Sequence, residues 1–366
     1  MQVKFVDLGR QYQDLRREIL DAVDEVFKSG WYVLGPKLEQ FEYEFAEYCG
    51  VKHAVGVGNG SDALYLILDA LNVGPGDEVI TAPNSYIASA AAIARTGATP
   101  VFCDVGDDMN LDPAQLEAAI TNRTKAVMPV HLTGRIAKME QIQEIAGRHQ
   151  VHVVEDAAQS VGASRKGKQA GSFGVAAGFS LHPLKNLFVH GDGGVVTTDS
   201  DELADRIRQS RNHGLKNRDE AEFWGINSRL DEAQAAIGLI KLRHIDQWNS
   251  RHREIAEYYS DALRGVVDVP VEAEDESSVY HRYMIRTLKR DGLAEYLAEN
   301  GVETKVNYRV PLHLMPAANE LGYGQGSFPV SEELANTILS LPLYASLTDD
   351  ESEFVAHAVR SFDRRT

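Results

Sequence analysis

The sequence predicts an α/β protein with a large domain built on a mostly parallel sheet and a smaller α+β C-terminal domain. From residue 54 to residue 210, short apolar segments alternate with amphipathic ones. This pattern is typical of β-α-β units that place helices on both faces of a sheet. The candidate site residues in this part follow strand ends, where such sheets bind ligands. Near Asn249 the pattern changes, so we expect domains spanning residues 1–248 and 249–366.

The composition narrows the classes of ligand and partner. The chain has 366 residues and a formal net charge of -17 at pH 7. Because nucleic-acid and membrane-surface binding need a basic stripe, we expect neither partner, and local basic groups must hold any anionic ligand. Cys49 and Cys103 are too few for a disulfide framework or a cysteine zinc site, and no histidines show HxH or HExxH spacing, so we expect no metal. No leader peptide or membrane-length apolar run is evident, which makes the cytoplasm the expected compartment.

Two amphipathic helices are predicted before the first strand. Residues 12–28 place apolar side chains at helical spacing, and Ser29-Gly30 ends the helix. A turn through Trp31 and Tyr32 leads to a second helix that ends near Cys49-Gly50. Packing between the two helices explains these aromatic side chains as well as an active-site position does. We therefore assign them no catalytic role.

A glycine-rich turn follows the first strand. It reads Gly58-Asn59-Gly60, and a helix starts at Ser61. Glycines let the backbone approach an anion, and the N–H groups and dipole of a helix N-terminus favour phosphate. A serine that opens a helix is usually only a cap. The turn is therefore weak evidence for a phosphate site when taken by itself.

Strands and helices then alternate. The predicted strands comprise residues 77–83, 100–104, 124–129, 151–155, 176–181, 195–198 and 279–286. The predicted helices comprise one that begins at residues 84–86, then residues 113–120 (capped by Asp112), 138–148, 201–210, 231 to about 263, and 291–300.

The segment from Glu155 to Gly194 is the most informative part of the chain. Asp156 directly follows one apolar strand, and the next strand leads to Lys185 in a loop. A Schiff base with an aldehyde needs an amine, and a protonated pyridine nitrogen needs a fixed anion. The pair therefore suits a pyridoxal phosphate site. A solvated surface lysine and a buried acid at a strand end are the alternative interpretations.

The chain resembles the sugar aminotransferases of the DegT/DnrJ/EryC1/StrS family almost from end to end. The resemblance is carried by EDAAQ (155–159), SLHPLKNL (180–187), GDGG (191–194), NGSDAL (59–64), GINSRLDE (225–232), NYRVPLH (307–313) and SLPLY (340–344). It implies a fold type I aminotransferase that uses pyridoxal 5'-phosphate. It also implies a homodimer with shared active sites.

The resemblance implies roles for individual residues. Lys185 is the Schiff-base lysine and proton carrier, and Asp156 pairs with the pyridine nitrogen. The other implied cofactor contacts are Tyr86 stacking on the ring, Gln159 near the phenolic oxygen, Gly60, Ser61, Asp62 and Ser180 at the phosphate, and Asn227 at the phosphate of the neighbouring subunit.

The implied substrates are a keto sugar linked to a nucleoside diphosphate and an amino donor, glutamate or glutamine. The motif around Lys185 resembles enzymes that act at C3 of the sugar more than those that act at C4. The candidate substrate contacts are His182, Arg229, Arg282, Lys305, Asn307, Tyr308 and Arg309. The chain departs from the family pattern at Leu184, at residues 188–190 and at Asn307. These departures affect the substrate and not the cofactor chemistry.

Three other functions compete with an aminotransferase. In dehydratases of this family a histidine replaces the Schiff-base lysine, whereas this chain retains Lys185. A non-catalytic regulatory protein on the same scaffold would not need Lys185, Asp156 and Gln159 together. A nicotinamide-binding protein is suggested only by residues 56–60, which lack the last glycine of the dinucleotide motif and the acid after a second strand. We reject this last alternative.

Overall fold

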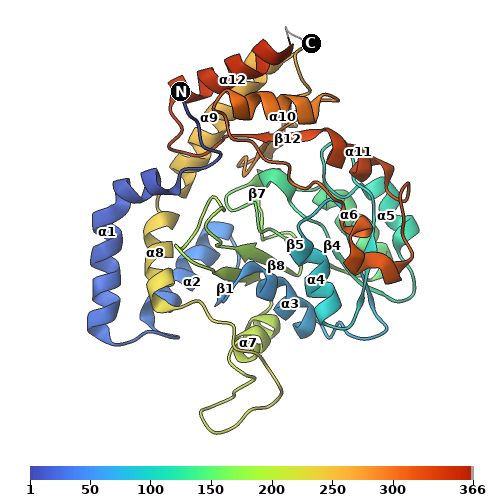
Figure 1. The fold of residues 1–366 in the computed structure, drawn as a ribbon. Helices are drawn as coiled ribbons and strands as arrows, with labels where there is room; N and C mark the ends of the chain where they lie inside the picture. The colour runs from blue at the N-terminus through green and yellow to red at the C-terminus, as the bar shows by residue number, and fades with distance from the viewer. Residues whose placement is uncertain (364–366) are drawn as a thin grey trace.

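The computed structural model describes residues 1–363. A central sheet lies between layers of helices, and a smaller group of helices and strands packs against it (Figure 1). The predicted α/β class with a mostly parallel sheet is confirmed.

The central sheet has seven strands in the order β1-β9-β8-β5-β4-β2-β3. These strands are β1 (His53–Val57), β2 (Glu78–Thr81), β3 (Thr99–Phe102), β4 (Thr124–Met128), β5 (His152–Asp156), β8 (Ala176–Ser180) and β9 (Gly194–Thr198). Neighbouring strands from β8 to β3 are parallel, whereas β9 is antiparallel to both of its neighbours. The carboxyl ends of β8, β5, β4 and β2 therefore lie along one edge, where the loops that follow can gather side chains around a ligand.

Alternating side chains of the strands divide the core between the two faces of the sheet. One face packs against α3 (Gly60–Ala70), α4 (Ile87–Arg95) and α7 (Asp201–Ser210). The other face packs against α2 (Pro36–Cys49), α5 (Pro113–Ala119), α6 (Met139–His149) and α8 (Glu232–Leu242). Helix α1 (Leu8–Ser29) lies against α8 on the outside. Helices therefore cover both faces, as the repeated β-α-β pattern predicts.

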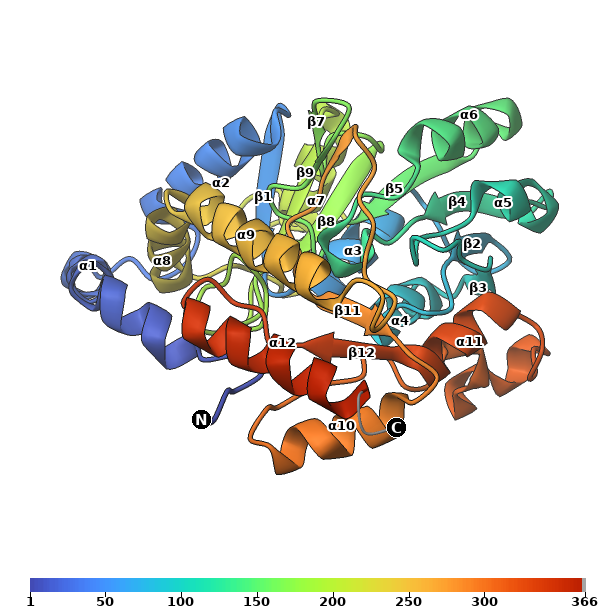
Figure 2. The ribbon, with the colours of Figure 1, turned by 90° about the horizontal axis from the view of Figure 1, so that it is seen from above.

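A second apolar core forms beside the central sheet. It lies between α9 (Ile245–Leu263), α10 (Arg290–Glu299), α12 (Asp349–Asp363) and the antiparallel pair β11 (Tyr283–Arg286) and β12 (Ile338–Leu341). Val3 packs into this core, while Ile245 belongs to the core of the large sheet. Helix α9 thus joins both cores, and Figure 2 shows it running across the molecule. The expected boundary between residues 248 and 249 falls inside α9, and the division into two domains stays a prediction.

The remaining elements are short. They are β6 (Ser164–Arg165), β7 (Lys168–Gln169), β10 (Glu276–Ser277), α11 (Pro329–Thr337) and the 3-10 helices Leu132–Gly134, Leu312–Leu314 and Pro316–Leu321. Along residues 1–363, none of the helices combines the length and the apolar character that crossing a membrane requires.

Two predicted elements differ from those in the structure. The expected helix 231–263 is broken at Arg243-His244 into α8 and α9. The break separates a helix that packs among α1 and α2 from one that enters the second core. The expected strand 279–286 is regular only from Tyr283, because residues before it follow the edge of the large unit, where Val279 bonds to Gly134.

Candidate active site

The predicted site residues gather around one cavity at the carboxyl ends of β5 and β8. The cavity has a volume of 440 Å³. Its lining includes Gly60, Ser61, Tyr86, Asp156, Gln159, Ser180, His182, Lys185, Arg282, Asn307 and Tyr308. These residues come from loops far apart in the sequence. The sheet order brings the loops together, because β5 and β8 are neighbours and α3 packs on β8.

Asp156 is the buried acid of the cavity. It ends β5, and its side chain accepts hydrogen bonds from Ser89 Oγ at 2.7 Å and from the N–H of Ala158 at 3.2 Å. Burial raises the pKa of Asp156, while these two donors and the charge of Lys185 oppose the rise. The donors hold the carboxylate in place and favour its ionised form. The side chain is therefore suited to fix a protonated nitrogen.

Lys185 lies in the turn after β8, where its N–H donates to the carbonyl of His182 at 2.8 Å. Burial, together with the charge of the nearby Arg282, lowers the pKa of the Lys185 ammonium to about 8, against the attraction of Asp156. A lysine with a lowered pKa offers a neutral amine near neutral pH. Lys185 can therefore act as a nucleophile toward an aldehyde and as an acid–base group.

The N-terminus of α3 closes one end of the cavity. Within residues 1–363, the N–H groups of Gly60 and Ser61 have no acceptor, whereas the N–H of Asp62 bonds to Asn59 Oδ1 at 2.8 Å. A Cβ on Gly60 would lie 2.7 Å from Cβ of Ser180, so only glycine fits between the turn and β8. Two free N–H groups, a helix dipole and the Ser180 hydroxyl make this end fit a phosphate.

Aromatic and amide side chains form the rest of the wall. Tyr86 is 55% exposed in the cavity, and its ring centroid lies 5.6 Å from that of Tyr308. Gln159 is buried and accepts from the N–H of Thr133 at 2.9 Å. Burial raises the pKa of Tyr308 to about 12, so its hydroxyl is neutral at physiological pH. The stacking role of Tyr86 stays a prediction that this placement allows.

Five of the predicted contacts do not line the cavity within this chain. The Asp62 carboxylate pairs with Arg95 and Ser228, both at 2.7 Å. Arg229 donates to Asn212, Arg309 pairs with Asp291, and Lys305 and Asn227 are exposed. Their proposed roles as cofactor or substrate contacts stay predictions. The strand pairing of Lys305 with Ser340 explains the position of the Lys305 backbone.

Sequence reasoning missed Ser89, the side chain that holds Asp156. Ser89 lies in the first turn of α4, and its hydroxyl is 2.7 Å from that of Ser85. The two serines are four residues apart, with Ser85 in the turn before α4 and Ser89 in its first turn. This spacing was the only signal available. The spacing of the two serines points to Asp156 only when the fold is known, because the fold brings the first turn of α4 to the end of β5.

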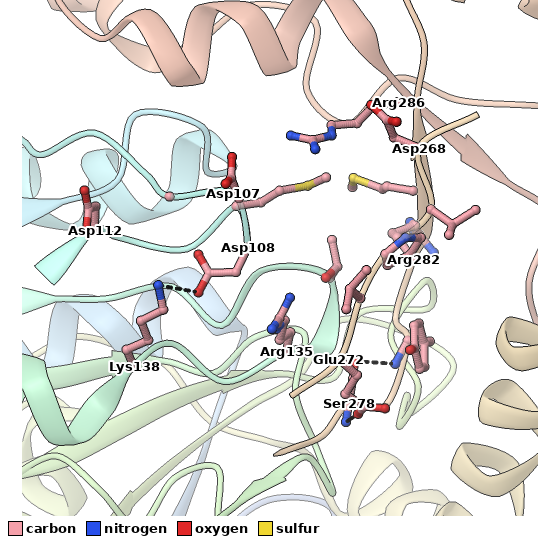
Figure 3. Close-up of a pocket in the computed structure, with 18 residues that line it drawn as sticks. Asp107, Asp108, Asp112, Arg135, Lys138, Asp268, Glu272, Ser278, Arg282 and Arg286 are labelled. Atoms are coloured by element: carbon pink, nitrogen blue, oxygen red, sulfur yellow. Dashed lines mark hydrogen bonds and ion pairs between the residues drawn. The ribbon is translucent and has the colours of Figure 1, made fainter. Parts of the chain in front are cut away.

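A second cavity of 490 Å³ shares Arg282 with the first, and Figure 3 shows the side chains that line it. Its walls are the loop 106–112, residues 133–138 and the segment 268–286. Among its charged side chains, Lys138 lies 3.5 Å from Asp108, and Arg135 pairs with Glu276 at 2.7 Å. Arg282 lines both cavities and forms part of the wall between them.

The chain belongs to the DegT/DnrJ/EryC1/StrS aminotransferase family, whose model matches residues 13–360. It is 46% identical to a dTDP-3-amino-3,4,6-trideoxy-alpha-D-glucose transaminase of Streptomyces venezuelae, over 99% of this chain and 97% of the relative. It is also 44% identical to a pleiotropic regulatory protein of Geobacillus stearothermophilus, over 100% of this chain and 99% of that protein.

Solved structures agree with this assignment. The crystal structure of S. venezuelae DesV in complex with a ketimine intermediate has a TM-score of 0.98 and 46% identity, covering 100% of this chain and 99% of that one. The structure of NtdA from Bacillus subtilis with bound cofactor PMP has a TM-score of 0.93 and 31% identity, covering 99% of this chain and 85% of that one. This chain is therefore a pyridoxal-phosphate-dependent sugar aminotransferase.

The residues of the 440 Å³ cavity fit this cofactor. Asp156 would supply the anion for the ring nitrogen, and Lys185 would supply the amine for the aldehyde. The free N–H groups of Gly60 and Ser61 face the space that the phosphate would occupy. Each group is on a different loop at the same sheet edge, which is the arrangement that the cofactor requires.

Proposed function

We propose that this enzyme transfers an amino group from L-glutamate or glutamine to a keto group of a nucleotide-linked sugar, more readily at C3 than at C4. The observation that carries the proposal is the presence of Lys185 and Asp156 in the lining of one cavity, where the charge of each affects the pKa of the other. The S. venezuelae relative, a transaminase of a dTDP-linked 3-amino sugar, supports the choice of C3. From this relative we take only the class of substrate, a nucleotide-linked sugar, and neither the particular nucleotide nor the particular sugar.

The side chains divide the chemical work between them. When bound, the cofactor supplies an aldehyde for the amine of the donor and an electron-withdrawing ring. The Asp156 carboxylate keeps the ring nitrogen protonated. Nζ of Lys185, with its lowered pKa, removes the proton from the reacting carbon of the substrate. When the reaction runs in reverse, the same amine gives a proton back to that carbon. Tyr86 and Tyr308 narrow the space between these groups and the solvent.

We also propose that the active unit is a homodimer with shared sites. Asn227 is exposed and lies in the loop between α7 and α8, which projects from the body of the molecule (Figure 1). Trp224 in the same loop is 99% exposed, and a partner subunit that covered the loop would remove its ring from water. In this proposal the partner subunit's Asn227 completes the phosphate end of the cavity.

The reverse reaction provides a direct test, because amino sugars are more stable than keto sugars. The loaded enzyme would be mixed with 2-oxoglutarate and a nucleotide-linked 3-amino or 4-amino sugar, and glutamate formation would be measured. We expect faster turnover of the 3-amino sugar. Faster turnover of the 4-amino sugar would reverse the assignment of the carbon, and no turnover of either would contradict the substrate class.

The dehydratase alternative remains the competing function within the family. Lys185 argues against it, since the resemblance implies a histidine there in dehydratases. A product analysis distinguishes the two functions, because an aminotransferase introduces nitrogen into the sugar whereas a dehydratase removes water from it.

A further inference from the structure

Arg282 carries a buried charge that no acid among residues 1–362 neutralises. Its side chain is 9% exposed, lies 5.1 Å from the ring of Phe5, and donates to the carbonyl of His281 at 3.0 Å. The other buried arginines have acid partners, since Arg211 pairs with Glu42 and Arg290 with Asp291. Among the side chains of residues 1–362, no carboxylate lies within ion-pair distance of Arg282. A buried cation without a partner is costly unless a ligand supplies the anion.

The surroundings of Arg282 leave its charge uncompensated. Burial lowers the pKa of Arg282 to about 10, so the guanidinium stays charged at neutral pH. Burial also lowers the pKa of His281 and His252, which makes both neutral. Asp156 is the buried acid of this cavity, and Ser89 and Ala158 already hold it.

Arg282 is close to the reaction centre. It lines the cofactor cavity together with Lys185 and Tyr308. Its charge acts on both Lys185 and Tyr308, since it lowers the pKa of the first and opposes the rise in the second. An anion bound to Arg282 would therefore lie beside the carbon on which Lys185 acts.

We propose that Arg282 binds the α-carboxylate of the amino-acid donor. This inference rests on the proposed function. In an amino acid, the carboxylate is attached directly to the carbon that bears the reacting amine. In a sugar that reacts at C3, by contrast, the neighbouring carbons bear no charge and the diphosphate begins at C1. A buried cation beside Lys185 thus matches the donor better than it matches the sugar nucleotide, and a guanidinium can bind a carboxylate with two parallel hydrogen bonds.

Arg286, the last residue of β11, offers a matched control in the same segment. It lies four residues after Arg282, and Figure 3 shows its side chain pointing into the second cavity. Arg286 does not line the cofactor cavity. A substitution at Arg286 therefore removes the same charge from the neighbouring cavity and leaves the cofactor cavity intact.

The two half-reactions test the proposal separately. The loaded wild-type enzyme, Arg282→Gln and Arg286→Gln would each be mixed with glutamate, or with a nucleotide-linked amino sugar, and the change in the cofactor spectrum followed by stopped flow. For Arg282→Gln we expect the second-order rate constant with glutamate to fall about 30- to 100-fold, the loss of a hydrogen-bonded charge pair. The rate with the amino sugar should fall much less, because only the change in the pKa of Lys185 acts on both substrates. Arg286→Gln should stay within about threefold of wild type with both substrates.

Binding without reaction gives a second measurement. 2-Oxoglutarate has the α-carboxylate but no amine, and its dissociation constant for the loaded enzyme can be measured by calorimetry. We expect Arg282→Gln to weaken this binding by a factor similar to the rate loss with glutamate, whereas Arg286→Gln should not change it. Unchanged binding to Arg282→Gln would overturn the proposal.

Other outcomes also decide between interpretations. A loss confined to the amino sugar would assign Arg282 to the diphosphate, and equal losses with both substrates would make it a structural residue. If Arg282→Gln fails to fold, Arg282→Lys is the second variant to test, because it retains the charge. Its second-order rate constant should still fall more with glutamate than with the amino sugar. Equal losses in Arg282→Lys would contradict the proposal. If wild type does not react with either substrate, the proposed function fails independently of Arg282.

Discussion

The hydrogen bond from Ser89 to Asp156 should control the acid side of the pH profile. Ser89 Oγ donates to Asp156 Oδ2 at 2.7 Å in a buried setting, and this bond opposes the rise that burial causes in the pKa of Asp156. A hydrogen bond to a charged group contributes about 1.5 to 3 kcal/mol. Because about 1.4 kcal/mol corresponds to one pH unit, Ser89→Ala should move the acid limb of activity about one to two units toward higher pH. The direction follows because the variant carboxylate protonates more readily.

The assay is the pH dependence of kcat/KM for glutamate in wild type and Ser89→Ala. Ser85→Ala is the control, because Ser85 bonds to Ser89 but not to Asp156. We expect its acid limb to stay near that of wild type. An unchanged acid limb in Ser89→Ala, or an equal displacement in both variants, would refute the assignment of Ser89.

Four further predictions concern Lys185, the dimer and the stability of the fold. Lys185→Ala should abolish transamination and leave the thermal midpoint unchanged, and wild-type turnover in this variant would exclude it as the Schiff-base residue. In the cofactor-free protein, the rate of pyridoxal phosphate uptake should rise with pH around a midpoint of about 8, the pKa to which burial lowers Lys185, whereas a midpoint near 10.5 would show an unperturbed lysine. Asn227→Ala should weaken cofactor binding. Dimers that combine one Asn227→Ala subunit with one Lys185→Ala subunit should recover activity if the sites are shared, and no recovery would contradict sharing. Glu232 accepts from the N–H groups of Gly35, Lys37 and Leu38, so Glu232→Ala should lower the free energy of unfolding by about 2 to 4 kcal/mol in a urea titration, and a loss below about 0.5 kcal/mol would contradict this capping role.

The sequence predicted most of the fold because the strands and helices have local signals. Apolar runs bounded by turn residues identify β2, β4, β5 and β8, and Asp112 before Pro113 identifies the start of α5. The break between α8 and α9 has no such signal. Both helices are apolar on one side, and only their packing in different cores reveals that they separate at Arg243-His244.

The site was predictable where its residues adjoin strand ends. Asp156 and Lys185 follow β5 and β8, and parallel strands bring such residues to one edge of a sheet. Ser89 could not be identified, because its contact with Asp156 depends on the position of α4 over β5. For Arg282, Lys305 and Arg309, the sequence gives three similar cations. Tertiary packing buries the first and leaves the other two exposed.

The visible spectrum of the purified, loaded enzyme before and after the addition of glutamate tests the central claim most directly. We expect an absorption band from the aldehyde form bonded to Lys185, and we expect glutamate to convert it to the band of the amine form. That result would establish the cofactor, the role of Lys185 and the first half-reaction together. A band that glutamate leaves unchanged would contradict glutamate as the donor, and no band after addition of pyridoxal phosphate would contradict the assignment of the active site.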